Sequence, residues 1–117
     1  MSDLSYSLIK KELDVSALRQ RVIAHNIANI NTAGFKRSDV VFEDKLQDAL
    51  DKNGQYLDSV EPEVVRDDST SFREDGNNVD LDKEMTDMAE NNIMYDALVS
   101  QLDTKMGIMR TVINEGR

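Results

Sequence analysis

The sequence predicts an all-α protein in which long N- and C-terminal helices pair as an antiparallel coiled coil or helix bundle, with an irregular, partly mobile segment between them. Three observations support this fold class: a regular apolar repeat near the C-terminus, a weaker copy near the N-terminus, and a polar, glycine-containing stretch that separates them. The expected regions are an N-terminal coiled-coil helix over residues 1–34, an acidic middle segment over 35–78 and a C-terminal coiled-coil helix over 79–117.

The C-terminal region has the strongest pattern, because its apolar residues recur at alternating steps of four and three, which is typical of a coiled-coil seam. A helix over residues 81–113 would be about 50 Å long, more than the roughly 35 Å diameter of a compact chain of this length. We therefore expect it to need partner helices. The predicted seam consists of Leu81, Met85, Met88, Asn92, Tyr95, Val99, Leu102, Met106, Met109 and Ile113.

The N-terminal region carries a weaker apolar stripe that is interrupted at Lys11. We expect a helix from about Asp3 to about Asn31, paired with the C-terminal helix and then with further copies or relatives. A second stripe beside the first predicts contacts on more than one face. The first stripe is Leu4, Leu8, Val15, Leu18 and Val22, and the second is Ile9, Leu13, Ala17, Ala24, Ile27 and Ala28.

The middle segment is ambiguous at its start. Val40 to Phe42 could form a short strand, whereas Phe42, Leu46 and Leu50 have the spacing of a short amphipathic helix; we favour a turn followed by that helix. Residues 51–78 are rich in Asp, Ser, Asn and Gly, and we expect an exposed or mobile loop. The C-terminal helix should begin near Asp80, where acidic side chains favour the positive end of the helix dipole.

Composition limits the possible functions. The net charge is −9, and residues 43–87 contain fifteen acidic and five basic side chains, whereas a nucleic-acid surface needs clustered Lys and Arg. There is no cysteine for a disulfide, a zinc knuckle or a thiol nucleophile. The N-terminus lacks the pattern of a secretory signal, and no stretch approaches the roughly 20 apolar residues of a membrane span.

Sites for chemistry are weak in this sequence. His25 and Asn29 lie one helical turn apart, but a metal site needs further ligands, and no second histidine exists. The acidic residues after Asp75 resemble a calcium loop in composition only, and helix capping explains them better. Asp67 and Asp68 are adjacent in a predicted loop that would not hold them across a substrate. We therefore predict no enzymatic activity, no cofactor, no metal and no small-molecule substrate.

Two segments resemble a known family. Residues 22–37, VIAHNIANINTAGFKR, resemble the N-terminal signature of the bacterial flagellar axial proteins, the rod, hook and hook-associated subunits. Residues 75–85 and the helical pattern after them resemble the opening of the C-terminal helix in the rod members. Many rod proteins have Pro and Tyr on either side of the signature glycine, where this chain has Ala33 and Phe35. The signature positions are Asn26, Ala28, Asn29, Thr32, Gly34, Phe35 and Lys36.

The resemblance implies a structural subunit that polymerises through its terminal helices into the proximal rod of the torque-transmitting drive shaft. It implies uncleaved export by the flagellar type III system and assembly in the periplasm with other rod proteins, the basal-body adaptor protein FliE and the export gate. The acidic middle segment would lie at the rod surface or against neighbouring components. The alternative is a non-enzymatic coiled-coil adaptor, for which a single apolar stripe would suffice.

Several asparagines and Gly34 have predicted structural roles. Asn29 and Asn92 both fall on seam positions, where a buried amide fixes helix register at some cost in stability. The alternative is that these amides, with Asn26 and Asn31, cap helix ends and face solvent. We expect Gly34 to adopt the left-handed backbone conformation that ends a helix.

Overall fold

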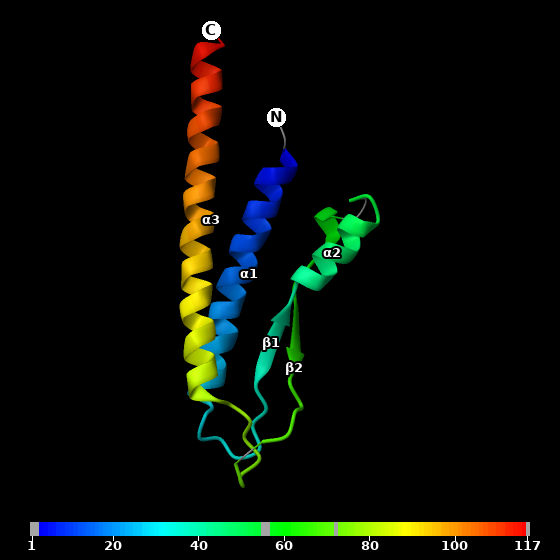
Figure 1. Cartoon of the computed structure of the whole chain (residues 1–117), viewed down its shortest axis with the longest axis vertical. Helices are drawn as coiled ribbons and strands as arrows, with labels where there is room; N and C mark the ends of the chain where they lie inside the picture. The colour runs from blue at the N-terminus through cyan, green and yellow to red at the C-terminus, as the bar shows by residue number, and fades with distance from the viewer. Residues whose placement is uncertain (1–2, 55–56, 72, 117) are drawn as a thin grey trace.

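The computed structural model describes residues 3–54, 57–71 and 73–116, and it confirms a mainly helical chain with two long terminal helices. Helix α1 (Asp3–Ala28) and helix α3 (Leu81–Glu115) run antiparallel and side by side (Figure 1). Between them come strand β1 (Ser38–Val41), helix α2 (Glu43–Asp51), the short 3₁₀ helix η1 (Leu57–Ser59) and strand β2 (Glu63–Arg66). We call residues 38–66 the arm.

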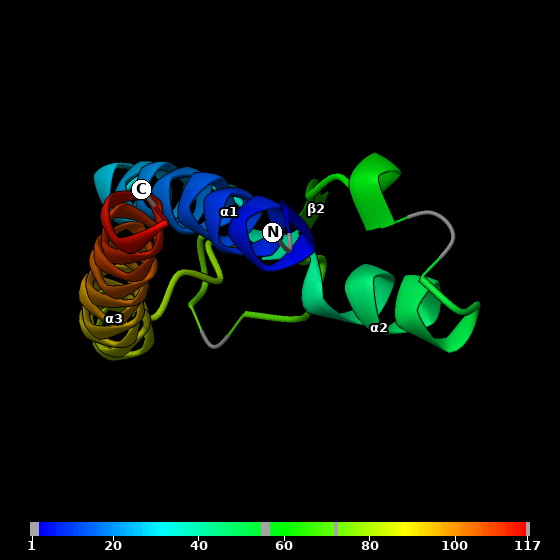
Figure 2. The same ribbon diagram turned by 90° about the horizontal axis from the view of Figure 1, so that it is seen from above.

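The molecule is elongated, with extents of 68 × 29 × 14 Å and a radius of gyration of 18.3 Å. A compact chain of this length would have a radius of gyration of about 13 Å. Seen from above, α2 and η1 extend away from α3 on the far side of α1 (Figure 2). Helix α3 also extends well past the start of α1 (Figure 1), which begins beside Leu98 and Gln101. We call residues 102–115, about 20 Å of helix, the projecting end of α3.

The apolar core lies between α1 and the arm. Val15 and Phe42 are each only 1% exposed. Lys11, which interrupts the N-terminal stripe, faces the arm and donates from Nζ to the Val60 carbonyl oxygen at 2.7 Å. The two terminal helices pair as expected, but the stripe is divided between two partners: its central residues cover the arm, whereas Leu4 and Leu8 lie in a groove with Leu98 of α3. The core contains Val15, Val40, Phe42, Ala49, Leu57 and Val60, with Leu18, Val22 and Leu46 packed against it.

Helix α3 packs on α1 through a face that differs from the predicted seam. Its buried residues are Glu84, Asn91 and Leu98, which repeat every seven positions. The predicted seam occupies the adjacent face, and Met85 and Tyr95 on it are 55% and 43% exposed. The seam is thus not the main contact between the two helices within one chain. Its packing against neighbouring chains stays a prediction.

The middle segment is more ordered than the sequence suggested. Both options for its start occur, because β1 precedes α2 directly. Strand β1 pairs antiparallel with β2, with Val40 opposite Val64 and Val41 opposite Glu63. Residues 51–78 are not wholly an exposed loop, since they include η1 and β2 and bury Leu57, Val60 and Asn77. The valines favour extended backbone, and one face of the pair covers α1.

The turn after α1 contains the signature glycine. Helix α1 ends at Ala28, three residues before the predicted end, and two further turns follow. Gly34 has φ +74°, which confirms the left-handed conformation, but within the second turn and not directly at the helix end. Its N–H donates to the Asp75 carbonyl oxygen at 2.7 Å, which joins this turn to the one before α3.

Replacing Gly34 tests the backbone requirement separately from side-chain space. A Cβ at this position would meet no atom within 4 Å, so strain in the left-handed backbone is the main cost. We expect Gly34→Val to lower the free energy of unfolding by about 1–2 kcal/mol and Gly34→Asn to lower it less, because asparagine visits this region more readily. Urea denaturation measures both. Equal losses for the two variants would contradict the assigned conformation.

Candidate assembly site

A buried polar cluster joins the end of α1 to the start of α3. Asn26 is fully buried. Its Nδ2 donates to Glu84 Oε1 at 2.6 Å and to the Ser38 carbonyl oxygen at 2.9 Å, while its Oδ1 accepts from the Ser38 N–H at 2.9 Å. The Asn26 side chain, which belongs to α1, is therefore hydrogen-bonded to both β1 and α3. The alternative in which Asn26 faces solvent is wrong.

Arg37 places a positive charge in the same cluster. Its Nε donates to Glu84 Oε2 at 3.1 Å, and its Nη1 lies 3.2 Å from Asp67 Oδ2 and 3.7 Å from Asp39 Oδ2. Burial alone would lower the pKa of Arg37, but the bonds to Glu84 and Asp67 outweigh it and raise the pKa. The pKa of Asp67 is lowered, first by hydrogen bonds from Ser69 and also by Arg37.

Two asparagines hold the turn before α3 against the turn after α1. Asn77 is fully buried, and its Nδ2 donates to the carbonyl oxygens of Asn29 and Thr32, both at 2.8 Å. The side-chain oxygen of Asn78 accepts from the Arg37 N–H at 2.7 Å. Every buried polar side-chain atom in the described part of the chain has a hydrogen-bond partner. We call Asn26, Arg37, Asn77, Asn78 and Glu84 the signature junction.

The other signature residues support this region locally. Asn29 donates from Nδ2 to the His25 carbonyl oxygen at 2.9 Å, so it caps the helix end and does not lie in a seam. Thr32 donates to Asn29 Oδ1 at 3.1 Å, and Lys36 donates to the Gly76 carbonyl oxygen at 2.6 Å. The rings of Phe35 and His25 meet edge to face at 5.6 Å. Ala28 is exposed, as is Asn31.

The amide at the centre of the α1–α3 contact is Asn91 and not Asn92. Asn91 is 8% exposed. Its Nδ2 donates to the Ser16 carbonyl oxygen at 2.9 Å and to Gln20 Oε1 at 3.1 Å, and its Oδ1 accepts from Ser16 Oγ at 3.0 Å. Asn92 is exposed. Within one chain the buried amide is therefore Asn91, about 100° around the helix from Asn92, and a register-fixing role of Asn92 against neighbouring chains stays a prediction.

A matched pair of substitutions separates these two asparagines. We expect Asn91→Leu to lower the free energy of unfolding by about 1–3 kcal/mol, because it removes the hydrogen-bond partner of the buried Ser16 hydroxyl and of the half-buried Gln20 amide. Asn92→Leu should change it by no more than about 0.5 kcal/mol. Urea denaturation followed by circular dichroism gives both values. A larger loss for Asn92→Leu would contradict the assigned face.

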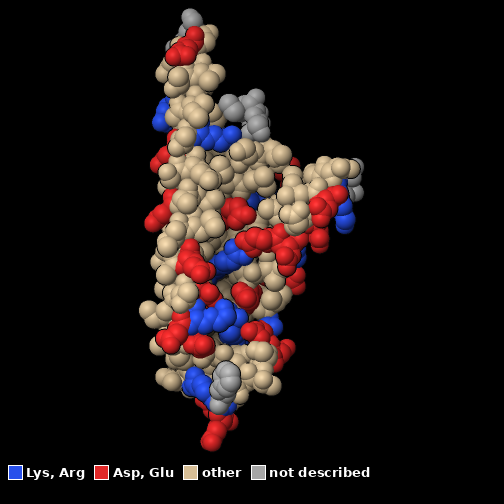
Figure 3. Space-filling model, viewed as in Figure 1, with Lys and Arg blue, Asp and Glu red and all other residues tan. Residues whose placement is uncertain are grey.

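Helix α3 exposes many large apolar side chains outside its contact with α1. Ile93 is 71% exposed, and Ile108, Val112 and Ile113 are each 58% exposed. The space-filling view shows mainly uncharged atoms over the projecting end, whereas charges gather lower down and on the arm (Figure 3). Exposed apolar surface of this extent is typical of a protein interface. The outer α3 surface consists of Leu81, Met85, Ile93, Met94, Tyr95, Met106, Ile108, Val112 and Ile113.

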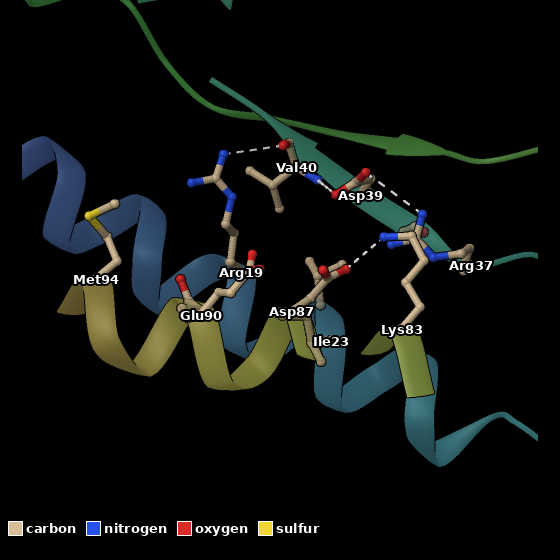
Figure 4. A pocket seen from close by; sticks show the side chains of 12 residues that line it. Arg19, Ile23, Arg37, Asp39, Val40, Lys83, Asp87, Glu90 and Met94 are labelled. Atoms are coloured by element: carbon tan, nitrogen blue, oxygen red, sulfur yellow. Dashed lines mark hydrogen bonds and ion pairs between the residues drawn. The ribbon is translucent and has the colours of Figure 1, made fainter. Parts of the chain in front are cut away.

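A cleft of about 340 Å³ lies between α1, β1 and α3 (Figure 4). Its charged groups largely pair with each other: Lys83 with Asp87 at 2.8 Å, and Arg37 with Asp39. Arg19 in its wall forms a two-bond ion pair with Glu43, and this bonding lowers the pKa of Glu43. The Lys83–Asp87 and Arg37–Asp39 pairs each lie within one short segment of the chain, whereas Arg19–Glu43 joins α1 to α2.

Two further observations concern the part of the chain that the structure describes. No group of three or more His, Cys, Asp or Glu side chains there is placed to hold a metal ion. The long helices are too polar for any of them to cross a membrane. Asp80 instead caps α3, because its side chain accepts from the N–H groups of Asp82 and Lys83.

Comparison with known proteins identifies the family. Residues 16–36 match the family described as flagella basal body rod protein. The chain is 34% identical to the flagellar basal body rod protein FlgB of Bacillus subtilis, over 93% of this chain and 92% of that protein. It is 40% identical to FlgB of Borrelia hermsii over 80% and 83%, and 27% identical to FlgB of Escherichia coli over 97% and 96%. This chain belongs to the FlgB family of flagellar basal body rod proteins, and it is a structural, non-enzymatic component of the rod.

Proposed function

We propose that this subunit polymerises into the proximal rod through the outer α3 surface, while the signature junction holds each subunit in shape. Membership of the FlgB family favours a rod subunit over a coiled-coil adaptor. It also implies assembly with other rod proteins. The proposal adds which surfaces make those contacts.

The main support for this proposal is the exposed apolar surface of α3. A helix of a stable monomer buries its apolar face, yet α3 buries Glu84, Asn91 and Leu98 and exposes Met85, Ile93 and other large apolar side chains. Leaving that much apolar surface in water is unfavourable, by about 25 cal/mol for each Å². Contact with neighbouring helices on several sides of α3 would remove it from water.

We extend the proposal to partners and route, for which the family resemblance is the support. The basal-body adaptor protein FliE and the export gate would contact the base of the rod that this subunit begins. The chain would reach the periplasm through the flagellar type III system without cleavage. The arm, whose helix α2 carries Glu43, Asp44, Asp48 and Asp51, would then face the rod exterior or a surrounding component.

A pair of substitutions on the projecting end tests the interface. Met106 and Thr104 are both exposed, and because they are two residues apart they point to nearly opposite sides of α3. We expect Met106→Glu to fold normally but to abolish rod formation and swimming in a strain that lacks the natural copy. Thr104→Glu adds the same charge and should retain more function.

The folding of both variants is checked by circular dichroism and urea denaturation, where changes within about 0.5 kcal/mol are expected. Electron microscopy of isolated basal bodies then counts complete rods. Normal rods and normal swimming with Met106→Glu would contradict the proposed use of this surface.

A further inference from the structure

The projecting end of α3 carries a self-complementary pattern on one face. Lys105, Ile108, Val112 and Glu115 are separated by three, four and three residues, so they lie along one side of the helix. The spacing is symmetric about its centre. Opposite charges stand at the two ends, and two aliphatic side chains stand between them.

This face has no partner in the described part of the chain. Helix α1 begins only at the level of Leu98 and Gln101, so it does not reach the face. Ile108 and Val112 are each 58% exposed. Neither Lys105 nor Glu115 forms an ion pair with another described residue.

We propose that two copies of this chain associate in solution through this face, as an antiparallel pair related by a two-fold axis. In that register Lys105 of each chain faces Glu115 of the other, and Ile108 faces Val112. A two-fold contact uses the same surface twice, and the symmetric spacing meets this requirement. A parallel pair in register would place like charges opposite each other, which is unfavourable.

The space beside the projecting end suits such a partner. An antiparallel partner helix would run in the same direction as α1, beside the part of α3 that extends past the start of α1 (Figure 1). Glu115 of the partner chain would lie beside Lys105 of the first chain, which is about 6 Å along α3 from Gln101 of that same chain. There α1 and α3 enclose an apolar groove lined in part by Leu4, Leu8 and Leu98. The negative end of the partner helix would approach the positive end of α1, which is favourable.

The expected contact is small. One helix face over the projecting end buries less than the roughly 800 Å² per partner of a typical stable interface. The pair should therefore be weak and concentration-dependent. This inference goes beyond the proposed function, because it concerns pairing of the free chain in solution. Ile108 and Val112 belong to the outer α3 surface, but they lie on a different side of the helix from Met106.

Sedimentation equilibrium of the full chain, from about 10 μM to about 1 mM, tests the pairing. We expect a monomer–dimer equilibrium. Lys105→Glu and Glu115→Lys should each weaken dimerisation about tenfold, because each places two like-charge contacts in the interface. The double variant should restore it to within about threefold of the natural chain. Lys105 and Glu115 of one chain are about 15 Å apart, so such restoration needs contact between chains.

Two substitutions test the apolar part. Ile108→Asp should abolish the dimer, whereas Thr104→Asp, on another side of the helix, should leave it. Circular dichroism confirms that α3 remains helical in each variant. A chain that stays monomeric up to about 1 mM would overturn the proposal. So would a double charge reversal that associates no better than the single variants, since the association would then use another face or direction.

Discussion

Glu84→Ala is expected to lower the free energy of unfolding by about 3–5 kcal/mol, as is usual when one partner of a buried ion pair is removed. Glu84 is fully buried and accepts from both Asn26 and Arg37. The substitution would leave the guanidinium of Arg37, a residue only 5% exposed, without its buried counter-charge. Because natural domains are stable by only about 5–15 kcal/mol, this loss would remove much of the total. Urea denaturation followed by circular dichroism measures it.

Two comparisons sharpen this test. Asp96→Ala removes an exposed carboxylate from the same helix and should change the free energy of unfolding by less than about 0.5 kcal/mol. Glu84→Gln keeps the shape and one acceptor but removes the charge, so its loss should fall between the other two. A loss below about 1 kcal/mol for Glu84→Ala would show that the signature junction does not hold the helices together.

Phe42→Ala is expected to lower the free energy of unfolding by about 3–5 kcal/mol for a different reason, because it leaves a cavity in the apolar core. Phe42 joins β1 to α2 and is 1% exposed, so its ring lies at the centre of the contact between the arm and α1. Thermal or urea denaturation gives the loss.

Leu50→Ala is the matched control for the core. Leu50 lies on α2, the helix that follows Phe42, but it is 45% exposed, so its truncation should cost less than about 1 kcal/mol. Hydrogen exchange on Phe42→Ala should show lost protection in α2 and β1 before α3. Uniform loss of protection across the chain would contradict the assignment of this core to the arm and α1 alone.

The long helices could be predicted because their apolar periodicity is local and extends over many turns. Asp80 was expected near the start of α3 and caps it. Strand pairing was missed because it involves only four residues on each side, and Val40 and Val64 meet across a long connection. Each strand is too short to show a detectable alternation of apolar and polar residues. The burial of Val15 against this sheet then follows from a contact that no local pattern contains.

The site was predicted in position but not in detail. The signature residues do gather at one end of α1, yet their decisive partners Glu84 and Asn77 are distant in sequence. Glu84 belongs to the acidic run after Asp75 for which helix capping is the predicted role. The sequence places Asn92 in the seam because it continues the apolar repeat, and no local pattern singles out Asn91. The apolar repeat predicts a helix face that is buried in the assembled protein, but it does not distinguish burial within one chain from burial against a neighbouring chain. Here the monomer buries the more polar face and leaves the apolar one exposed.

The most direct test of this account is a cryo-electron microscopy map of isolated basal bodies at a resolution that shows side chains. We predict that Asn26 and Arg37 contact Glu84 of their own subunit in the rod, as in the free chain. We also predict that Met85, Ile93 and Met106 pack against helices of neighbouring subunits. A map in which the junction residues bind a neighbouring subunit, with the outer α3 surface left in solvent, would contradict the account.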